Sequence, residues 1–172
     1  MKTQPATAIA LLTTVAALLI MAGEAVLSSF NERLLRARGA IEPEGDVIGS
    51  MRWAYPAAFV LMGIEGALTG PAPPNVLVGG LALFGFAKAL KTWAISSLGT
   101  RWSYRVLVVP GEPLVTSGPY RFISHPNYLA VVGEIASVAA IVWAPISGVV
   151  ATIGFGCLMI ARIRVEDRAL GR

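Results

Sequence analysis

The hydrophobic positions of the chain fall into five runs separated by short polar or turn-forming segments. The runs cover about 6–27, 53–69, 76–98, 127–143 and 146–163. A helix needs about 20 apolar residues to cross the hydrocarbon core of a bilayer, with a lower limit near 17. The pattern therefore predicts an all-α, polytopic integral membrane protein with about five transmembrane helices, forming a single domain over residues 1–172.

The segments between the runs predict how these helices are joined. Three prolines within residues 71–74 make an uncharged turn, and Pro145 separates the last two runs into a tight hairpin. Residues 31–39 continue the first run as a short amphipathic stretch with a terminal glycine, which is typical of a helix at the membrane interface. The longest segment that cannot span a bilayer runs from Ser96 to His125.

Composition narrows the class of protein further. Hydrophobic residues make up 55% of the chain and charged residues 14%, with a mean hydropathy of +0.68, whereas an ordinary soluble domain is roughly 25% charged. This balance excludes a disordered chain and a coiled coil, and the single cysteine, Cys157, excludes a disulfide within the chain. A cleaved signal peptide is a competing interpretation of the first run, but that run exceeds the roughly 7 to 15 apolar residues of such a segment.

Basic residues lie almost entirely on one side of the predicted membrane. Lys2 alone precedes the first run, whereas all eleven arginines fall in segments assigned to the opposite side. By the positive-inside rule, the amino terminus faces out, and the carboxyl terminus and the polar segments face the cytoplasm. The net charge of +4 does not indicate nucleic-acid binding, because the basic residues lie at the ends of apolar runs rather than in one dense stripe.

Candidate chemistry lies in the polar segment 102–128. It is rich in turn formers and hydrogen-bond donors, and Tyr120, His125 and Tyr128 lie close to the start of the fourth run. Free backbone N–H groups at a helix start favour an anion. From the residues alone two interpretations stay open: a ligand site, or a solvated connector in which His125 and the proline after it only begin the helix.

Three motifs together give the chain a family resemblance. They are Leu-Val-Thr-Ser-Gly-Pro-Tyr at 114–120, His-Pro-Asn-Tyr at 125–128 and, after a hydrophobic hairpin, Arg162 followed by Glu166-Asp167 and Leu170. In this combination, roughly the last 75 residues resemble the isoprenylcysteine carboxyl methyltransferase family of integral membrane methyltransferases. The front of the chain resembles the short bacterial branch whose members O-methylate alkylpyrones, which implies a location in a bacterial inner membrane.

The resemblance implies a cofactor and a site for it. S-adenosylmethionine would be the methyl donor, leaving S-adenosylhomocysteine, in a cytoplasmic pocket formed by residues 101–128 and 162–170. Arg162 would be the catalytic residue that faces the substrate. The residues implied to bind the cofactor are Arg105, Glu112, Pro113, Leu114, Val115, Tyr120, His125, Pro126, Asn127, Tyr128 and Glu166.

The chain departs from the family pattern in four places. Ser124 stands where arginine usually precedes His-Pro, Arg105 takes a position often held by glutamine, and Asp167 replaces a second glutamate. The chain also stops just past Leu170, without part of the pocket lid of the eukaryotic enzymes. A bacterial lipid-like acid or enol is therefore a better candidate acceptor than prenylcysteine.

Methyl transfer to an ionised oxygen requires alignment and exclusion of water more than acid–base catalysis. We therefore expect an O-methyltransferase acting on the carboxylate or acidic hydroxyl of a lipophilic substrate that enters from the bilayer. Arg162 can steer that anion, and Glu166, one turn later, can accept hydrogen bonds from the cofactor, although without the motifs the same pair would indicate a surface ion pair. A metal is not expected, because one histidine and one cysteine cannot supply a normal ligand set.

Other functions stay open at this point. A phospholipid N-methyltransferase uses the same donor, but a cationic Arg162 beside an amine acceptor is unfavourable. A membrane reductase of the sterol-reductase type would need a nicotinamide site that the sequence does not show. A non-enzymatic membrane scaffold would use the polar segment to dock a partner.

The remaining polar and small residues of the runs predict internal packing. Glu65 and Glu134 lie in apolar runs, where an ionised carboxylate is costly, so each should face the bundle or carry a proton. Structural pairing, with Lys88 or Lys91 as candidate partners, is favoured over direct contact with a substrate. Small residues are expected to permit close approach of helices, at Gly79, Gly80, Gly85, Gly154 and Gly156.

Overall fold

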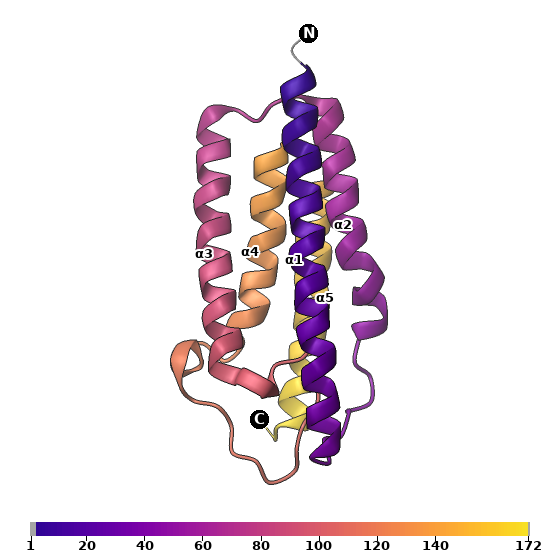
Figure 1. Cartoon of the computed structure of the whole chain (residues 1–172), viewed down its shortest axis with the longest axis vertical. Helices are drawn as coiled ribbons and strands as arrows, with labels where there is room; N and C mark the ends of the chain where they lie inside the picture. Colours follow the sequence, from indigo (N-terminus) through magenta and orange to yellow (C-terminus); the bar gives the residue numbers. More distant parts are fainter. Residues whose placement is uncertain (1–2, 172) are drawn as a thin grey trace.

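The computed structural model describes residues 3–171 and arranges them as a bundle of long helices (Figure 1). The helices are α1 (Thr3–Ala37), α2 (Ile48–Thr69), α3 (Pro74–Leu98), α4 (Pro126–Val142) and α5 (Ser147–Ala169), with two short 3₁₀ turns, η1 (Gly99–Arg101) and η2 (Gly118–Arg121), between α3 and α4. Extended pairing within residues 3–171 is limited to a bridge between Ile41 and Val108. The predicted all-α fold is confirmed.

Within the described residues, three stretches are long and apolar enough to cross a bilayer: Pro5–Ala37, Pro74–Arg101 and Pro145–Ala169. The 17-residue α4 is a shorter apolar helix. The outer surface of α1 is apolar, with Leu11 62%, Leu12 68% and Leu19 67% exposed, and such a surface is unfavourable in water. The chain is therefore a polytopic integral membrane protein, whereas crossing by α2 and α4 stays a prediction.

The first helix continues well beyond its apolar run. The run ends near residue 27, but α1 continues to Ala37 and takes in most of the stretch assigned to the interface. Asn31 and Leu35 on this extension are 2% and 1% exposed, so the extension is packed within the protein rather than lying flat on a membrane. Similarly, α2 begins at Ile48, before the predicted start of the second run.

Glycines set the closest approaches between helices, though mostly not the expected ones. A Cβ on Gly80 would lie 3.0 Å from the Cβ of Ala140, which confirms packing there. The prediction is wrong for four other positions, where nothing lies within 4 Å of such a Cβ: Gly79, Gly85, Gly154 and Gly156. Close contacts involve instead Gly63 against Thr14, Gly66 against Val142 and Gly148 against Ala139.

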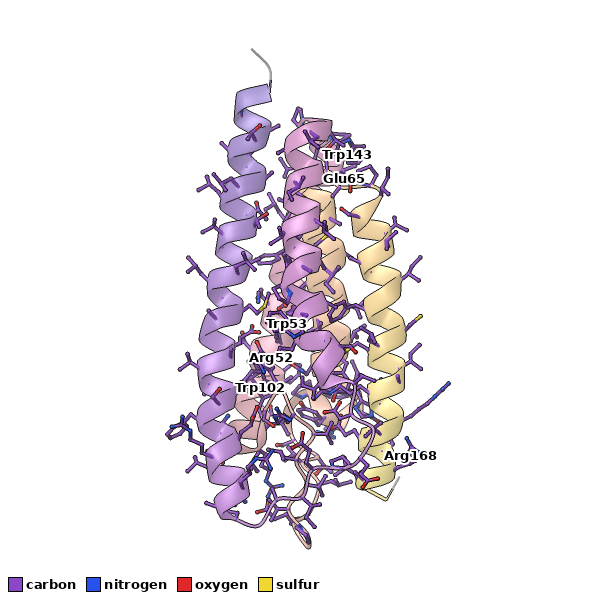
Figure 2. The ribbon with its side chains drawn as sticks, turned by 90° about the vertical axis from the view of Figure 1, so that its right-hand side faces the viewer. Arg52, Trp53, Glu65, Trp102, Trp143 and Arg168 are labelled. Carbon is purple, nitrogen blue, oxygen red and sulfur yellow. The ribbon has the colours of Figure 1, made fainter. Side chains whose placement is uncertain are left out.

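Glu65 makes a structural pairing, as favoured, but its partner is the start of α5 and neither of the two candidate lysines. Its carboxylate accepts hydrogen bonds from the backbone N–H groups of Ile146 (2.9 Å) and Ser147 (2.7 Å), and from the Ser147 hydroxyl. It therefore caps the N-terminus of α5, where free N–H groups favour a negative charge. Figure 2 shows Glu65 close to Trp143 at the end of the bundle away from Arg168.

Glu134 does pair with both lysines, as expected. Lys88 and Lys91 of α3 lie 2.8 Å and 3.0 Å from its carboxylate oxygens, and they contact Glu24 of α1 at 3.3 Å and 2.6 Å. We call these four residues the charged cluster. It ties α1, α3 and α4 together inside the bundle, and the side chains of Lys91 and Glu134 are each only 3% exposed.

Candidate active site

Buried polar side chains of α1 hold the polar segment that follows α3. The Asn31 side-chain amide donates a hydrogen bond to the Trp102 carbonyl oxygen at 2.8 Å, and the Ser28 hydroxyl accepts one from the Tyr104 backbone N–H at 2.8 Å. The Trp102 side chain is itself buried. The segment is therefore a packed part of the fold, which argues against a solvated connector.

The loop between α1 and α2 lies across the same segment. Ile41 and Val108 exchange two backbone hydrogen bonds, of 2.8 Å and 3.0 Å. Beside them, Glu42 lies 2.5 Å from both Arg36 and Arg105. Burial alone would raise the pKa of Glu42, but the hydrogen bonds from the two arginines outweigh it and lower that pKa below its usual value.

A cavity of about 400 Å³ lies between α1, α2, α4 and α5, and we call it the inner cavity. Its size falls within the range of small-molecule sites, roughly 300–1,000 Å³. Part of its wall is apolar, including Met21, Val131 and Phe155. Its charged lining is mostly cationic, with one carboxylate, that of Glu32, against Arg52, Lys91, Arg105 and Arg162. The cavity therefore suits a molecule with an apolar part and an anionic head.

Two smaller cavities, of about 90 Å³ and 130 Å³, lie between the polar segment and the end of α5. Arg101, Tyr120, Glu166 and Leu170 line both of them. The two are therefore parts of one space, which we call the outer cleft.

Asn127 and Tyr128, at the start of α4, form the wall between the two spaces, because they line both the inner cavity and the outer cleft. The Tyr128 hydroxyl donates to Glu166 Oε2 at 2.5 Å and accepts from Arg162 Nε at 3.1 Å. Asn127 Oδ1 is buried without a hydrogen-bond partner, which is unfavourable unless a ligand or water satisfies it. Ligands in the two spaces would meet at this wall.

Arg162 faces the inner cavity from α5 and is 3% exposed. Besides Tyr128, its guanidinium contacts the Tyr104 carbonyl oxygen and lies 3.5 Å from Asp46 Oδ2. A guanidinium carries five N–H donors in a fork that matches a carboxylate. Arg162 is thus a fixed, buried cation beside the wall.

His125 lies on the outer side of the wall, directly before α4. Its Nε2 is 2.9 Å from Asp167 Oδ1, its Nδ1 is 3.6 Å from Glu166 Oε2, and its ring stacks on Tyr128 with centroids 5.5 Å apart. Contact with Glu166, and secondarily with Asp167, raises the pKa of His125 above its usual 6.5, although burial acts in the opposite direction. The imidazole therefore connects the start of α4 to the end of α5.

Most residues predicted to bind the cofactor come together around the outer cleft. One part of the cleft is lined by Arg105, Tyr120, His125, Asn127, Tyr128 and Glu166, and the other by Glu112, Pro113, Leu114 and Val115, together with Tyr120 and Glu166. Pro126 is buried at the start of α4 and lines neither the cleft nor the inner cavity. Glu112 is held by Arg38 and, at 3.0 Å, by Arg101, so its carboxylate is already paired.

Sequence reasoning did not predict that α1 and the loop after it supply polar side chains that support the candidate site. Glu24, Ser28 and Asn31 are polar, point into the bundle and are spaced four and three residues apart, which places them on one helix face. This row of polar residues on one helix face is the feature of the sequence from which their role could have been predicted. Asp46, which contacts Arg162 and accepts a hydrogen bond from the Val106 N–H at 3.3 Å, has no comparable pattern around it.

The sequence of the chain is similar to a known family and to a bacterial protein. Residues 80–172 match the sequence model of the isoprenylcysteine carboxyl methyltransferase (ICMT) family. A protein of Bacillus subtilis (strain 168), described as uncharacterized protein YpbQ, is 32% identical over 154 residues, which cover 87% of this chain and 89% of that relative. The stretch matched to the family begins in α3 and includes the wall, Arg162 and Glu166.

Proposed function

The chain belongs to the isoprenylcysteine carboxyl methyltransferase family of membrane methyltransferases, and on this premise we propose that it methylates an oxygen of a lipophilic acid. The family uses S-adenosylmethionine as its methyl donor. The acceptor is a carboxylate or an acidic hydroxyl, prenylcysteine-like or alkylpyrone-like, on a molecule that reaches the inner cavity from the bilayer. The observation that carries this proposal is Arg162, a buried cation that lines a cavity with a partly apolar wall.

The outer cleft offers groups that fit S-adenosylmethionine. The Glu166 carboxylate and the Tyr120 ring suit positive charge, which this cofactor carries on its sulfonium and its amino group. Arg101 suits its carboxylate. The unpartnered Asn127 Oδ1 at the wall can accept a further hydrogen bond from a ligand.

The wall brings donor and acceptor together. When bound, S-adenosylmethionine would supply an electrophilic methyl group, which an already ionised acceptor oxygen can accept without losing a proton. Arg162 would hold that oxygen on the inner side of the wall through charge-assisted hydrogen bonds. Glu166, on the outer side, shares the Tyr128 hydroxyl with Arg162. These residues therefore act by alignment and by excluding water rather than by general base catalysis.

The charges of the inner cavity favour an acid over an amine. At the wall, where the methyl group would be transferred, the cavity presents the guanidinium of Arg162, and an amine nitrogen at that point would gain nothing from a neighbouring cation. This supports O-methylation over phospholipid N-methylation.

Calorimetric titration of the detergent-purified protein with S-adenosylmethionine and S-adenosylhomocysteine tests the cofactor half of the proposal. Glu166→Gln should weaken binding about tenfold, the effect of losing one hydrogen bond to a charged group. Glu44→Gln is the matched control, because Glu44 is exposed in the loop after α1 and lines neither space. Absence of cofactor binding by folded wild-type protein would contradict the proposal.

Arg162→Met tests the acceptor half. Methyl transfer from labelled cofactor to a panel of lipid acids and alkylpyrones should fall at least tenfold, because the acceptor anion loses its counter-charge. Cofactor affinity should stay within about threefold of the wild-type value, since Arg162 lines the inner cavity only. An equal loss of cofactor binding and turnover would contradict this assignment of Arg162.

A further inference from the structure

One residue of the charged cluster, Lys91, lines the inner cavity. Lys88, one helical turn away and bound to the same two carboxylates, lines a separate small space. Ionised side chains inside a membrane-spanning bundle are costly and usually serve a function. A buried ion pair also adds little stability compared with apolar packing of the same volume. Stability alone therefore does not account for a lysine at this place.

Lys91 has a hydrogen-bond donor left for a ligand. An ammonium group carries three N–H donors, and Lys91 Nζ directs two of them to Glu24 Oε2 at 2.6 Å and Glu134 Oε2 at 3.0 Å. The nearby tyrosine hydroxyls donate to the same carboxylates, Tyr55 to Glu134 at 2.7 Å and Tyr104 to Glu24 at 3.2 Å. The remaining N–H of the ammonium group is thus the donor that the cluster can offer to a molecule in the cavity.

Lys91 and Arg162 line the same inner cavity, and their partners on α4 indicate how far apart along the bundle they lie. Arg162 contacts Tyr128 and Lys91 contacts Glu134, and these two partners lie six positions apart on α4. At 1.5 Å per residue this corresponds to about 9 Å along the helix. With a hydrogen bond of about 3 Å at each end, we expect a head group with two oxygen functions a few bonds apart to be of the size that engages both donors.

We propose that Lys91 is a second recognition point for the acceptor and donates a hydrogen bond to an oxygen other than the one that is methylated. This inference rests on the proposed function and narrows its substrate class. The acceptor is an acid or enol whose head group carries an additional carbonyl or hydroxyl oxygen, while its chain occupies the apolar part of the inner cavity. A plain fatty acid, which has no second oxygen function, is a poor acceptor.

Two acids of equal chain length test this proposal. N-dodecanoylglycine and pentadecanoic acid both end in a carboxylate, but only the first has an amide carbonyl near it. In methyl-transfer assays in nanodiscs, wild-type protein should prefer N-dodecanoylglycine by about tenfold in kcat/KM, the effect of one hydrogen bond to a charged donor. Lys91→Met should remove the preference by lowering kcat/KM for N-dodecanoylglycine alone.

Lys88→Met is the matched control. It removes the same charge from the same cluster, but Lys88 does not line the inner cavity, so the preference should persist. Should Lys91→Met fail to fold, Lys91→Met with Glu24→Gln keeps the cluster neutral and is compared with Lys88→Met carrying Glu24→Gln.

Three results would overturn the inference: equal rates for the two acids in wild-type protein, action on neither acid, or an unchanged preference in the Lys91 variant. Cofactor binding is titrated on the same samples. With cofactor binding intact, equal rates for the two acids or an unchanged preference in the Lys91 variant contradicts only the role of Lys91. Action on neither acid also contradicts the proposed acceptor class, and loss of cofactor binding by wild-type protein contradicts the proposed function itself.

Discussion

Tyr128 is the residue at which the two binding spaces are coupled. Its hydroxyl bonds to Arg162 on the inner side and to Glu166 on the outer side, and its ring stacks on His125. The resemblance to the family implies that this tyrosine binds the cofactor, and the structure adds its contact with Arg162, which we propose holds the acceptor. A single side chain therefore contacts residues of both spaces and fixes where they adjoin.

His125 should make stability depend on pH. Contact with Glu166 and Asp167 raises its pKa in the folded state above the ordinary value of 6.5, so folding favours the protonated imidazole. This contribution is fully present below the pKa of the unfolded chain and is lost as pH rises through the folded pKa. At pH 5.5, His125→Gln should lower the free energy of unfolding in detergent by up to about 1 kcal/mol, as expected for a partly exposed ion pair.

The test compares the free energies of unfolding of wild-type protein and the His125→Gln variant at each pH. The difference between them should be largest at about pH 5.5 and shrink toward about pH 9, where the imidazole is neutral in both states. A difference that stays constant, or grows with pH, would show that the protonated form is not the one that holds α4 to α5.

At the scale of elements, the bundle depends on a few places where helices approach closely. Gly148, near the start of α5, packs closely against Ala139 of α4. At Gly154 and Gly156 on the same helix, nothing lies within 4 Å of the position that a Cβ would take. The capping of α5 by Glu65 fixes the same hairpin from α2. The end of the bundle opposite the inner cavity and the outer cleft is therefore stabilised by close helix packing and by the Glu65 cap on α5.

Two alanine substitutions in α5 should have opposite effects. Gly148→Ala should lower the free energy of unfolding by about 1–3 kcal/mol, because its methyl group overlaps the Ala139 side chain. Gly154→Ala, in open space on the same helix, should be neutral or raise it by up to about 1 kcal/mol, since alanine favours the helix. Thermal unfolding of both variants in one detergent measures this, and equal effects would contradict the packing described.

These elements also show where sequence reasoning succeeds. The length of the apolar runs was enough to predict the number of long helices, and the His-Pro-Asn-Tyr and Arg-x-x-x-Glu motifs bring their residues together because each lies within one or two turns of one helix. The partner of Glu65 and four of the five glycines were predicted wrongly because an apolar helix shows no contrast between its lipid-facing and protein-facing sides. Asp46 and Glu24 reach their partners only through contacts between segments far apart in the chain.

At the scale of the whole molecule, charge and chemistry gather at the same end. The end of α1, the start of α2, the polar segment, the start of α4 and the end of α5 meet there (Figure 1). The same region carries all the arginines of residues 3–171, and the inner cavity is lined there by Arg52, Arg105 and Arg162. A cofactor made in the cytoplasm and an acceptor dissolved in the bilayer can both reach the wall only if this end faces the cytoplasm.

This orientation predicts an asymmetric pattern of cysteine labelling. In a Cys157→Ser background, Asn75→Cys places a thiol at the exposed start of α3, at the opposite end, and Arg168→Cys places one near the end of α5. A membrane-impermeant maleimide should label the Asn75 variant in intact spheroplasts and the Arg168 variant only after permeabilisation, because the arginine-rich end stays inside. The Cys157→Ser protein alone gives the background. Labelling of the Arg168 variant in intact spheroplasts would place the outer cleft on the side without the methyl donor, and the proposed reaction would then have no route to its cofactor.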